Sequence, residues 1–110
     1  MSIWNLKEEE KRRANIAMAS ADYAEKLCGA VKEMTQADRS RALVAAAMEL
    51  INETISINSP MWKDCACGDI GCGQWYPETD AEKKVVGLLW AVKEALWDMP
   101  AALQQLEEEE

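Results

Sequence analysis

The chain has 110 residues, 49% of them hydrophobic, and a formal net charge of −8 at pH 7, which fits one globular domain with a single core. Its 20 acidic residues against 12 basic ones lead us to expect repulsion from phosphate backbones and anionic lipid surfaces, so neither direct nucleic-acid binding nor membrane binding is predicted. Six Met, five Trp and no Phe accompany many Ala, a mixture more typical of helices than of sheets.

The opening residues MSIWNLKEEEKRRAN contain no apolar segment of the kind that directs secretion. Nowhere do about 18 apolar residues follow one another, as a membrane-spanning helix requires. We therefore expect a cytoplasmic protein. In that compartment the four cysteines are expected to be thiols or metal ligands rather than structural disulfides.

A first helix is predicted over residues 5–34. It starts at Asn5, which is followed three residues later by Glu8 in the pattern of a helix N-cap. Cys28 lies at the edge of the apolar face of this helix. At 100° per residue, that face carries Ile16, Tyr23, Ala24, Leu27, Val31 and Met34.

A second helix is predicted over residues 36–58, after a capping pattern made by Thr35 and Asp38. Its apolar arc is about 200° wide, which predicts contacts on two sides and a central place in the core. The main face of this helix carries Leu43, Ala46, Ala47, Leu50, Thr54 and Ile57. The arc is widened by Val44, Met48, Ile51 and Ile55.

A third helix is predicted over residues 80–99, between a capping box of Thr79 with Glu82 and the helix-breaking Pro100. A second stripe beside its core face holds Val86, Trp90 and Trp97. The predicted core face itself is made of Val85, Leu88, Leu89, Val92, Leu96 and Met99.

Together these segments predict an all-α fold of three main antiparallel helices in a single domain, residues 1–106. Residues 101–106 are expected to add a short C-terminal turn, and Glu107 to Glu110 to form a solvated acidic tail.

Residues 59–78, SPMWKDCACGDIGCGQWYPE, are predicted to be a long cysteine-rich loop between the second and third helices. Helical bundles usually have connections of about 2 to 8 residues, and longer ones are often functional or held by a staple. Three of the four cysteines lie in this loop among glycines, which allow the tight turns that chelation by closely spaced thiolates requires. These cysteines are Cys65, Cys67 and Cys72.

The C-x-C-x4-C spacing is one ligand short of a tetrahedral zinc site, and the chain has no His. We predict one structural zinc, with Cys28 or a carboxylate as the fourth ligand. Reduced cysteines with packing roles, a disulfide such as Cys67 with Cys72, and an iron–sulfur centre remain alternatives. The candidate carboxylates are Asp64, Asp69 and Glu78.

Tryptophan is several times more frequent than in ordinary domains, and Trp is enriched both in cores and in binding hot spots. Trp62, Trp75 and Tyr76 flank the cysteines, where they either cover the core or form a docking surface for a protein partner. Trp90 and Trp97 either pack beneath the loop or form a subunit interface, which makes a homodimer possible.

Catalysis is not predicted. The chain lacks His, the phosphate-binding motif G-x-x-x-x-G-K-[ST] and the dinucleotide motif G-x-G-x-x-G. The first function hypothesis is a small acidic protein-interaction module, such as an inhibitor or adaptor that occludes a larger protein. The alternative is a helical protein whose cysteine and aromatic loop binds a small molecule or zinc.

Overall fold

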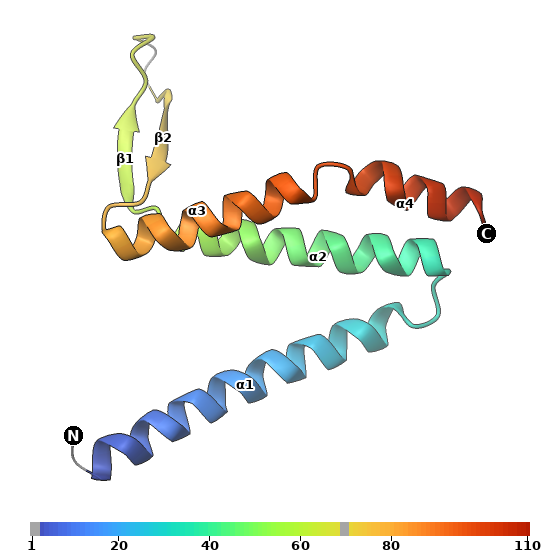
Figure 1. The fold of residues 1–110 in the computed structure, drawn as a ribbon, viewed down its shortest axis with the longest axis horizontal. Helices are drawn as coiled ribbons and strands as arrows, with labels where there is room; N and C mark the ends of the chain where they lie inside the picture. The colour runs from blue at the N-terminus through green and yellow to red at the C-terminus, as the bar shows by residue number, and fades with distance from the viewer. Residues whose placement is uncertain (1–2, 69–70) are drawn as a thin grey trace. The chain divides into compact units, whose positions relative to one another are not determined.

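A computed structural model describes residues 3–68 and 71–110, with the side chains of residues 7–68 and 71–110 (Figure 1). Contacts between Cα atoms divide the chain into two compact units, residues 1–35 and 36–110. The fold is mostly helical with a short two-stranded sheet, so the predicted fold class is confirmed.

The first unit is built on one helix, α1, Ile3–Val31. Asn5 lies inside this helix rather than at its cap, and the helix ends three residues before the predicted position 34. Its end is tightened by a bond from the Met34 backbone N–H to the Val31 carbonyl, 3.0 Å long. On its surface, Lys26 and Asp22 form an ion pair of 2.9 Å at the spacing of one helical turn.

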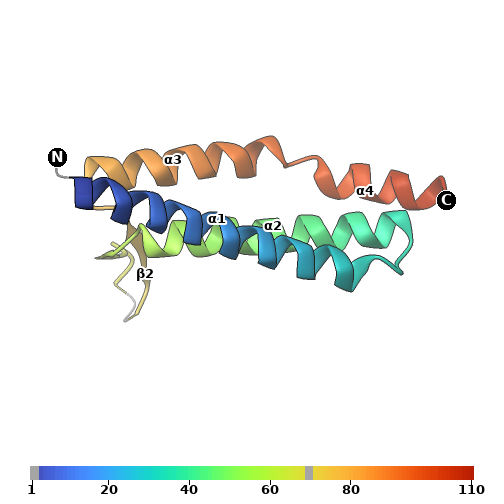
Figure 2. The same cartoon turned by 90° about the horizontal axis from the view of Figure 1, so that it is seen from below.

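The second unit contains helices α2, Gln36–Ile57, α3, Asp80–Ala95, and α4, Met99–Glu108. α2 and α3 run antiparallel side by side, and α4 lies against the first half of α2 (Figures 1 and 2). α2 therefore contacts both other helices of this unit, in agreement with its wide apolar arc.

The predicted capping box of α3 is confirmed. The Thr79 hydroxyl accepts a bond of 3.1 Å from the Glu82 backbone N–H, and the Glu82 carboxylate accepts one of 2.8 Å from the Thr79 N–H. Two N–H groups at the helix start, which have no partner within the helix, are satisfied in this way. The bond from the Thr79 N–H to the ionised carboxylate is the largest cause of the lowered pKa of Glu82.

The third helix ends at Ala95 rather than near Met99, and the expected short terminal turn is a ten-residue helix, α4. Pro100 lies in the first turn of α4, where a missing N–H costs nothing because no carbonyl of the helix precedes it. Pro100 therefore starts a new helix, whereas the sequence interpretation treated it only as a stop.

The last four glutamates, predicted as a solvated tail, begin in α4, and two of them reach α2. Glu107 forms an ion pair with Arg41, which lowers the pKa of the Glu107 carboxyl. Glu110 accepts a bond of 2.8 Å from the backbone N–H of Ala37. A carboxylate there satisfies a free N–H and interacts favourably with the helix dipole at the start of α2.

The contact between α2 and α3 uses only part of the predicted core face of α3. Val86 is buried, with 7% of its surface exposed, whereas Val85, Leu88 and Val92 of the predicted core face are 38%, 60% and 43% exposed. The line of α3 that faces α2 lies between the two predicted stripes. It joins buried Val86 with half-buried Leu89 and Leu96, whereas Trp90 and Trp97 are exposed. Periodicity locates both stripes but does not rank them.

The predicted cysteine-rich loop is a β-hairpin of strands β1, Met61–Asp64, and β2, Gly73–Tyr76 (Figure 1). In the antiparallel register, Met61 is opposite Tyr76 and Trp62 is opposite Trp75. Aromatic residues favour strands, but four residues are too few for alternation to reveal them in the sequence.

Candidate metal centre

The hairpin brings two of the predicted ligands to opposite positions at its tip. Asp64 pairs with Gly73 as the last residues of the ladder, and the next residues outward are Cys65 and Cys72. The Cys65 backbone N–H donates a bond of 3.0 Å to the Cys72 carbonyl. Strand pairing therefore holds these two thiols close together.

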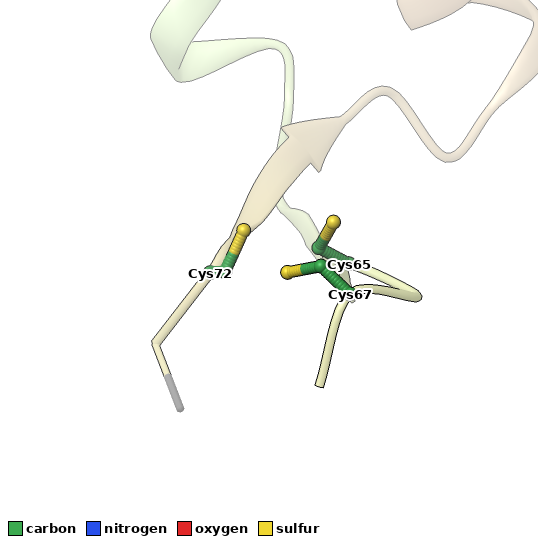
Figure 3. Close-up of side chains that lie close together, drawn as sticks. All are labelled: Cys65, Cys67 and Cys72. Atoms are coloured by element: carbon green, nitrogen blue, oxygen red, sulfur yellow. The ribbon is translucent and has the colours of Figure 1, made fainter. Parts of the chain in front are cut away.

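Cys67 completes the cluster because the chain turns back sharply beyond Cys65. Gly68 and Gly71 adopt positive φ angles of 86° and 83°, a region of backbone conformation that glycine enters without steric cost. The sulfur atoms of all three hairpin cysteines lie within 4.8 Å of one another (Figure 3). The three can hold a metal ion.

The geometry is close to what zinc requires. Four sulfurs placed about 2.3 Å from a tetrahedral zinc ion are about 3.8 Å apart, so the three thiols need to approach by only about 1 Å. Cys65 and Cys67 are exposed and Cys72 is half-buried, so an ion reaches the site directly from solvent.

The thiol of Cys72 has a raised pKa. Its side-chain contact with Cys67 is the largest cause, followed by its contact with Cys65 and by partial burial. The four cysteines all lie in the described part of the chain, and none of them is in a disulfide. The Cys67–Cys72 disulfide considered from the sequence is thus not present.

No fourth metal-binding side chain is grouped with the three cysteine sulfurs in the described residues. Within residues 3–68 and 71–110, the group that can hold a metal consists of the three hairpin cysteines. The Asp64 carboxylate instead accepts a bond of 2.8 Å from the Trp62 indole N–H. Asp69 lies outside the described residues, and Cys28 belongs to α1 in the other unit. Cys28 as the fourth ligand stays a prediction.

Gly73 is a residue of the site that the sequence interpretation credited only with turn formation. A Cβ atom at this position would lie 2.5 Å from the Lys63 carbonyl oxygen and 2.5 Å from Cζ2 of Trp62. The Trp62 ring therefore lies against the backbone of Gly73, and any side chain there must displace the ring or the strand.

Aromatic side chains cover the hairpin below the cysteines. The rings of Trp62 and Trp75 meet edge to face with centroids 5.2 Å apart. The Lys63 ammonium lies 5.0 Å from the centroid of the Tyr76 ring. The hairpin therefore presents aromatic surface on both of its sides.

Two neighbouring grooves lie on the tryptophan side of α3 and share Trp90. A groove of 380 Å³ has Trp75, Tyr76 and Val86 in its walls. A groove of 620 Å³ has Met48 and Trp97 in its walls, and 84% of the Trp97 surface is exposed. The structure thus gathers Trp75, Tyr76, Trp90 and Trp97 along one surface, here called the tryptophan groove. Trp62 instead packs on Trp75 in the hairpin.

Comparison of the chain with protein-family models, with curated proteins and with solved structures finds no match. Within the described residues, no helix is both long and apolar enough to cross a membrane.

Proposed function

We propose that this protein is a non-enzymatic metal-binding module that holds one zinc ion through Cys65, Cys67 and Cys72. The observation that carries the proposal is the approach of three sulfur atoms to within 4.8 Å of one another at the tip of the hairpin. Thiolates are preferred ligands of zinc, and closely spaced thiolates on a tight turn are typical of structural zinc sites.

The ion would act as a staple for the hairpin. Two four-residue strands joined by a loop are marginally stable in water, and a metal held by residues before and after the turn stabilises the folded arrangement. The rings of Trp62 and Trp75 lie on the same hairpin, so the ion would also fix their positions. Thiol ligands of this kind suit a reducing compartment such as the cytoplasm.

Titration of the metal-free, reduced protein with Co²⁺ tests this proposal, because cobalt replaces zinc and its thiolate complexes absorb strongly. We expect saturation at one equivalent of Co²⁺ and displacement of Co²⁺ by Zn²⁺. Cys67→Ser should lose the thiolate absorption. Cys28→Ser tests the fourth ligand: a change in the spectrum would place Cys28 in the site, and an unchanged spectrum would leave that position to water or another group. Absence of thiolate absorption in the unmodified chain would contradict the proposal.

A second candidate function is protein docking in the tryptophan groove, as expected of an adaptor or inhibitor. It is supported by the exposure of Trp97, 84%, and by the groove shared by Trp90 and Trp97. Exposed Trp is a common hot-spot residue, and a net charge of −8 favours a partner with a basic rim around an apolar anchor.

A photo-crosslinking residue placed at Glu94, in the wall of this groove, tests docking in the cells that make the protein. We expect a discrete crosslinked partner that disappears when Trp97→Ala is added. The same residue at Lys84, away from the groove, is the control. Crosslinks of equal yield at both positions, unaffected by Trp97→Ala, would count against this candidate.

A further inference from the structure

The three hairpin thiols form a group of donors whose number matches the valence of trivalent arsenic. In Figure 3, Cys72 faces Cys65 and Cys67 across the tip, and all three sulfur atoms lie within 4.8 Å of one another. Zinc needs a fourth ligand to complete its tetrahedron, whereas an arsenic(III) atom bonded to three sulfurs has its full set of bonds. The cluster by itself therefore supplies every ligand that arsenic(III) requires.

The surroundings of the thiols suit an uncharged ligand. A pocket of 310 Å³ beside the hairpin has Cys65 and Cys72 in its wall, together with Lys63, Asp64 and Tyr76. The wall thus carries a positive and a negative side chain, and the chain as a whole has a net charge of −8. This charge repels anions but does not repel a neutral molecule. Arsenous acid, the form that arsenite takes at neutral pH, is neutral and small enough to enter the pocket.

The charge of the product also favours arsenic. Three thiolates on one Zn²⁺ ion leave one excess negative charge, on a chain that is already acidic. Three sulfurs bonded to arsenic form a neutral group, because each As–S bond replaces a thiol proton. A neutral group costs less free energy than a charged one beside the half-buried Cys72.

Rotation of the side chains closes the remaining distance between the sulfurs. Three sulfurs on a tetrahedral zinc ion are about 3.8 Å apart, and the narrower bond angles of arsenic(III) bring them slightly closer. Cys65 and Cys67 are exposed, so their χ1 angles can change without displacing packed neighbours. The bond of 3.0 Å from the Cys65 N–H to the Cys72 carbonyl holds the two backbones in place meanwhile.

We propose that Cys65, Cys67 and Cys72 bind trivalent arsenic by condensation with arsenous acid. At each thiol an As–S bond forms, an As–O bond and an S–H bond break, and the thiol proton leaves with the hydroxyl group as water. One molecule of arsenous acid thus yields three molecules of water, and neither arsenic nor sulfur changes its oxidation state. The inference rests on the proposed function in using the same three-thiol site, from which arsenic displaces zinc.

Intact mass spectrometry of the full-length protein treated with sodium arsenite tests the inference. A phosphine keeps the thiols reduced, because dithiol reductants bind arsenic themselves. We expect one adduct, heavier than the chain by one arsenic atom less three hydrogen atoms, a difference that corresponds to three As–S bonds.

Cys67→Ser should leave one hydroxyl group on arsenic, so that its adduct is heavier than the chain by one arsenic and one oxygen atom less one hydrogen atom. It should also bind arsenite roughly tenfold or more weakly, because the third bond is closed within one molecule. Cys28→Ser removes a thiol outside the hairpin and is the matched control. Its adduct should match that of the unmodified chain.

Two results would overturn the inference. One is an unmodified chain that gains no arsenic, or whose adduct keeps oxygen and so has fewer than three As–S bonds. The other is a third bond that is lost in Cys28→Ser and kept in Cys67→Ser. The Co²⁺ titration separates this failure from that of the proposed function: a chain that binds Co²⁺ through thiolates but gains no arsenic keeps its metal centre, and a chain that forms three As–S bonds but binds no Co²⁺ loses it.

Discussion

The indole rings of Trp62 and Trp75 meet edge to face across the two strands of the hairpin, with centroids 5.2 Å apart and ring planes inclined by 64°. The two residues are directly opposed in the register, two positions below Asp64 and Gly73. The aromatic pair therefore lies on the same short hairpin as the cysteines, three positions before Cys65 on β1 and three positions after Cys72 on β2.

Trp75→Leu should remove this ring pair while keeping an apolar side chain. Aromatic pairs contribute about 0.5–1.5 kcal/mol beyond area burial, so we expect roughly 2- to 12-fold weaker metal binding if the hairpin must form for the ion to bind. A competition titration against a colorimetric chelator measures the change. Trp97→Ala, outside the hairpin, is the matched control, and equal effects of both substitutions would argue against a link between the ring pair and the metal.

Gly73→Ala should disturb the hairpin, because the added methyl group would meet the Lys63 carbonyl oxygen and the Trp62 ring, each at 2.5 Å. We expect weaker metal binding and a changed near-ultraviolet circular dichroism signal from the tryptophans. Gly87→Ala is the control, since a Cβ there meets nothing within 4 Å and α3 should gain up to about 1 kcal/mol. Unchanged metal affinity in Gly73→Ala would contradict the claim that close packing at Gly73 supports the metal-binding hairpin.

Thr79→Ala should destabilise the second unit by about 1 kcal/mol, because it removes the side chain that caps α3. Urea unfolding followed by circular dichroism at 222 nm measures the difference. Thr79→Ser keeps the hydroxyl and should retain most of the stability. A loss of equal size in both variants would point to the methyl group rather than to the cap.

Acid should weaken the second unit through Glu82 and Glu107. Both carboxyls have pKa values below the ordinary 4.5, Glu82 through its bond from the Thr79 N–H and Glu107 through Arg41. A carboxyl with a lowered folded-state pKa adds stability above its unfolded pKa, and this is lost as pH falls through the folded value. The free energy of unfolding should thus be steady above about pH 4.5 and fall below it.

Glu107→Gln should reduce the part of this pH dependence that comes from the Arg41 pair. Urea midpoints measured at neutral pH and below pH 4.5 show the change. Glu108→Gln is the control, because it removes the same single negative charge one residue further along the same helix. A pH dependence identical in both variants would exclude a stabilising role for the ion pair.

The sequence was sufficient for the features that depend on local chemistry. Thr79 with Glu82 predicted the start of α3, because a capping box requires only its own residues. The spacing of Cys65, Cys67 and Cys72 predicted that their thiols would lie close together, because eight residues with interleaved glycines have few ways to separate them.

Features that depend on contacts between segments far apart in the sequence were not predicted. α3 carries two apolar stripes, and only tertiary contacts decide that Val86 rather than Leu88 faces α2. The hairpin pairs Trp62 with Trp75 across 13 positions, a non-local contact that no window of a few residues reveals. The role of Glu110 at the start of α2 was missed for the same reason.

The native mass of the protein, purified under reducing conditions without added metal, shows directly whether the hairpin cysteines hold zinc. We expect a mass increment of one zinc ion per chain, lost on denaturation and absent from Cys67→Ser. An unmodified chain that carries no metal, and takes up none when incubated with Zn²⁺, would contradict the claim that the hairpin cysteines form a metal centre.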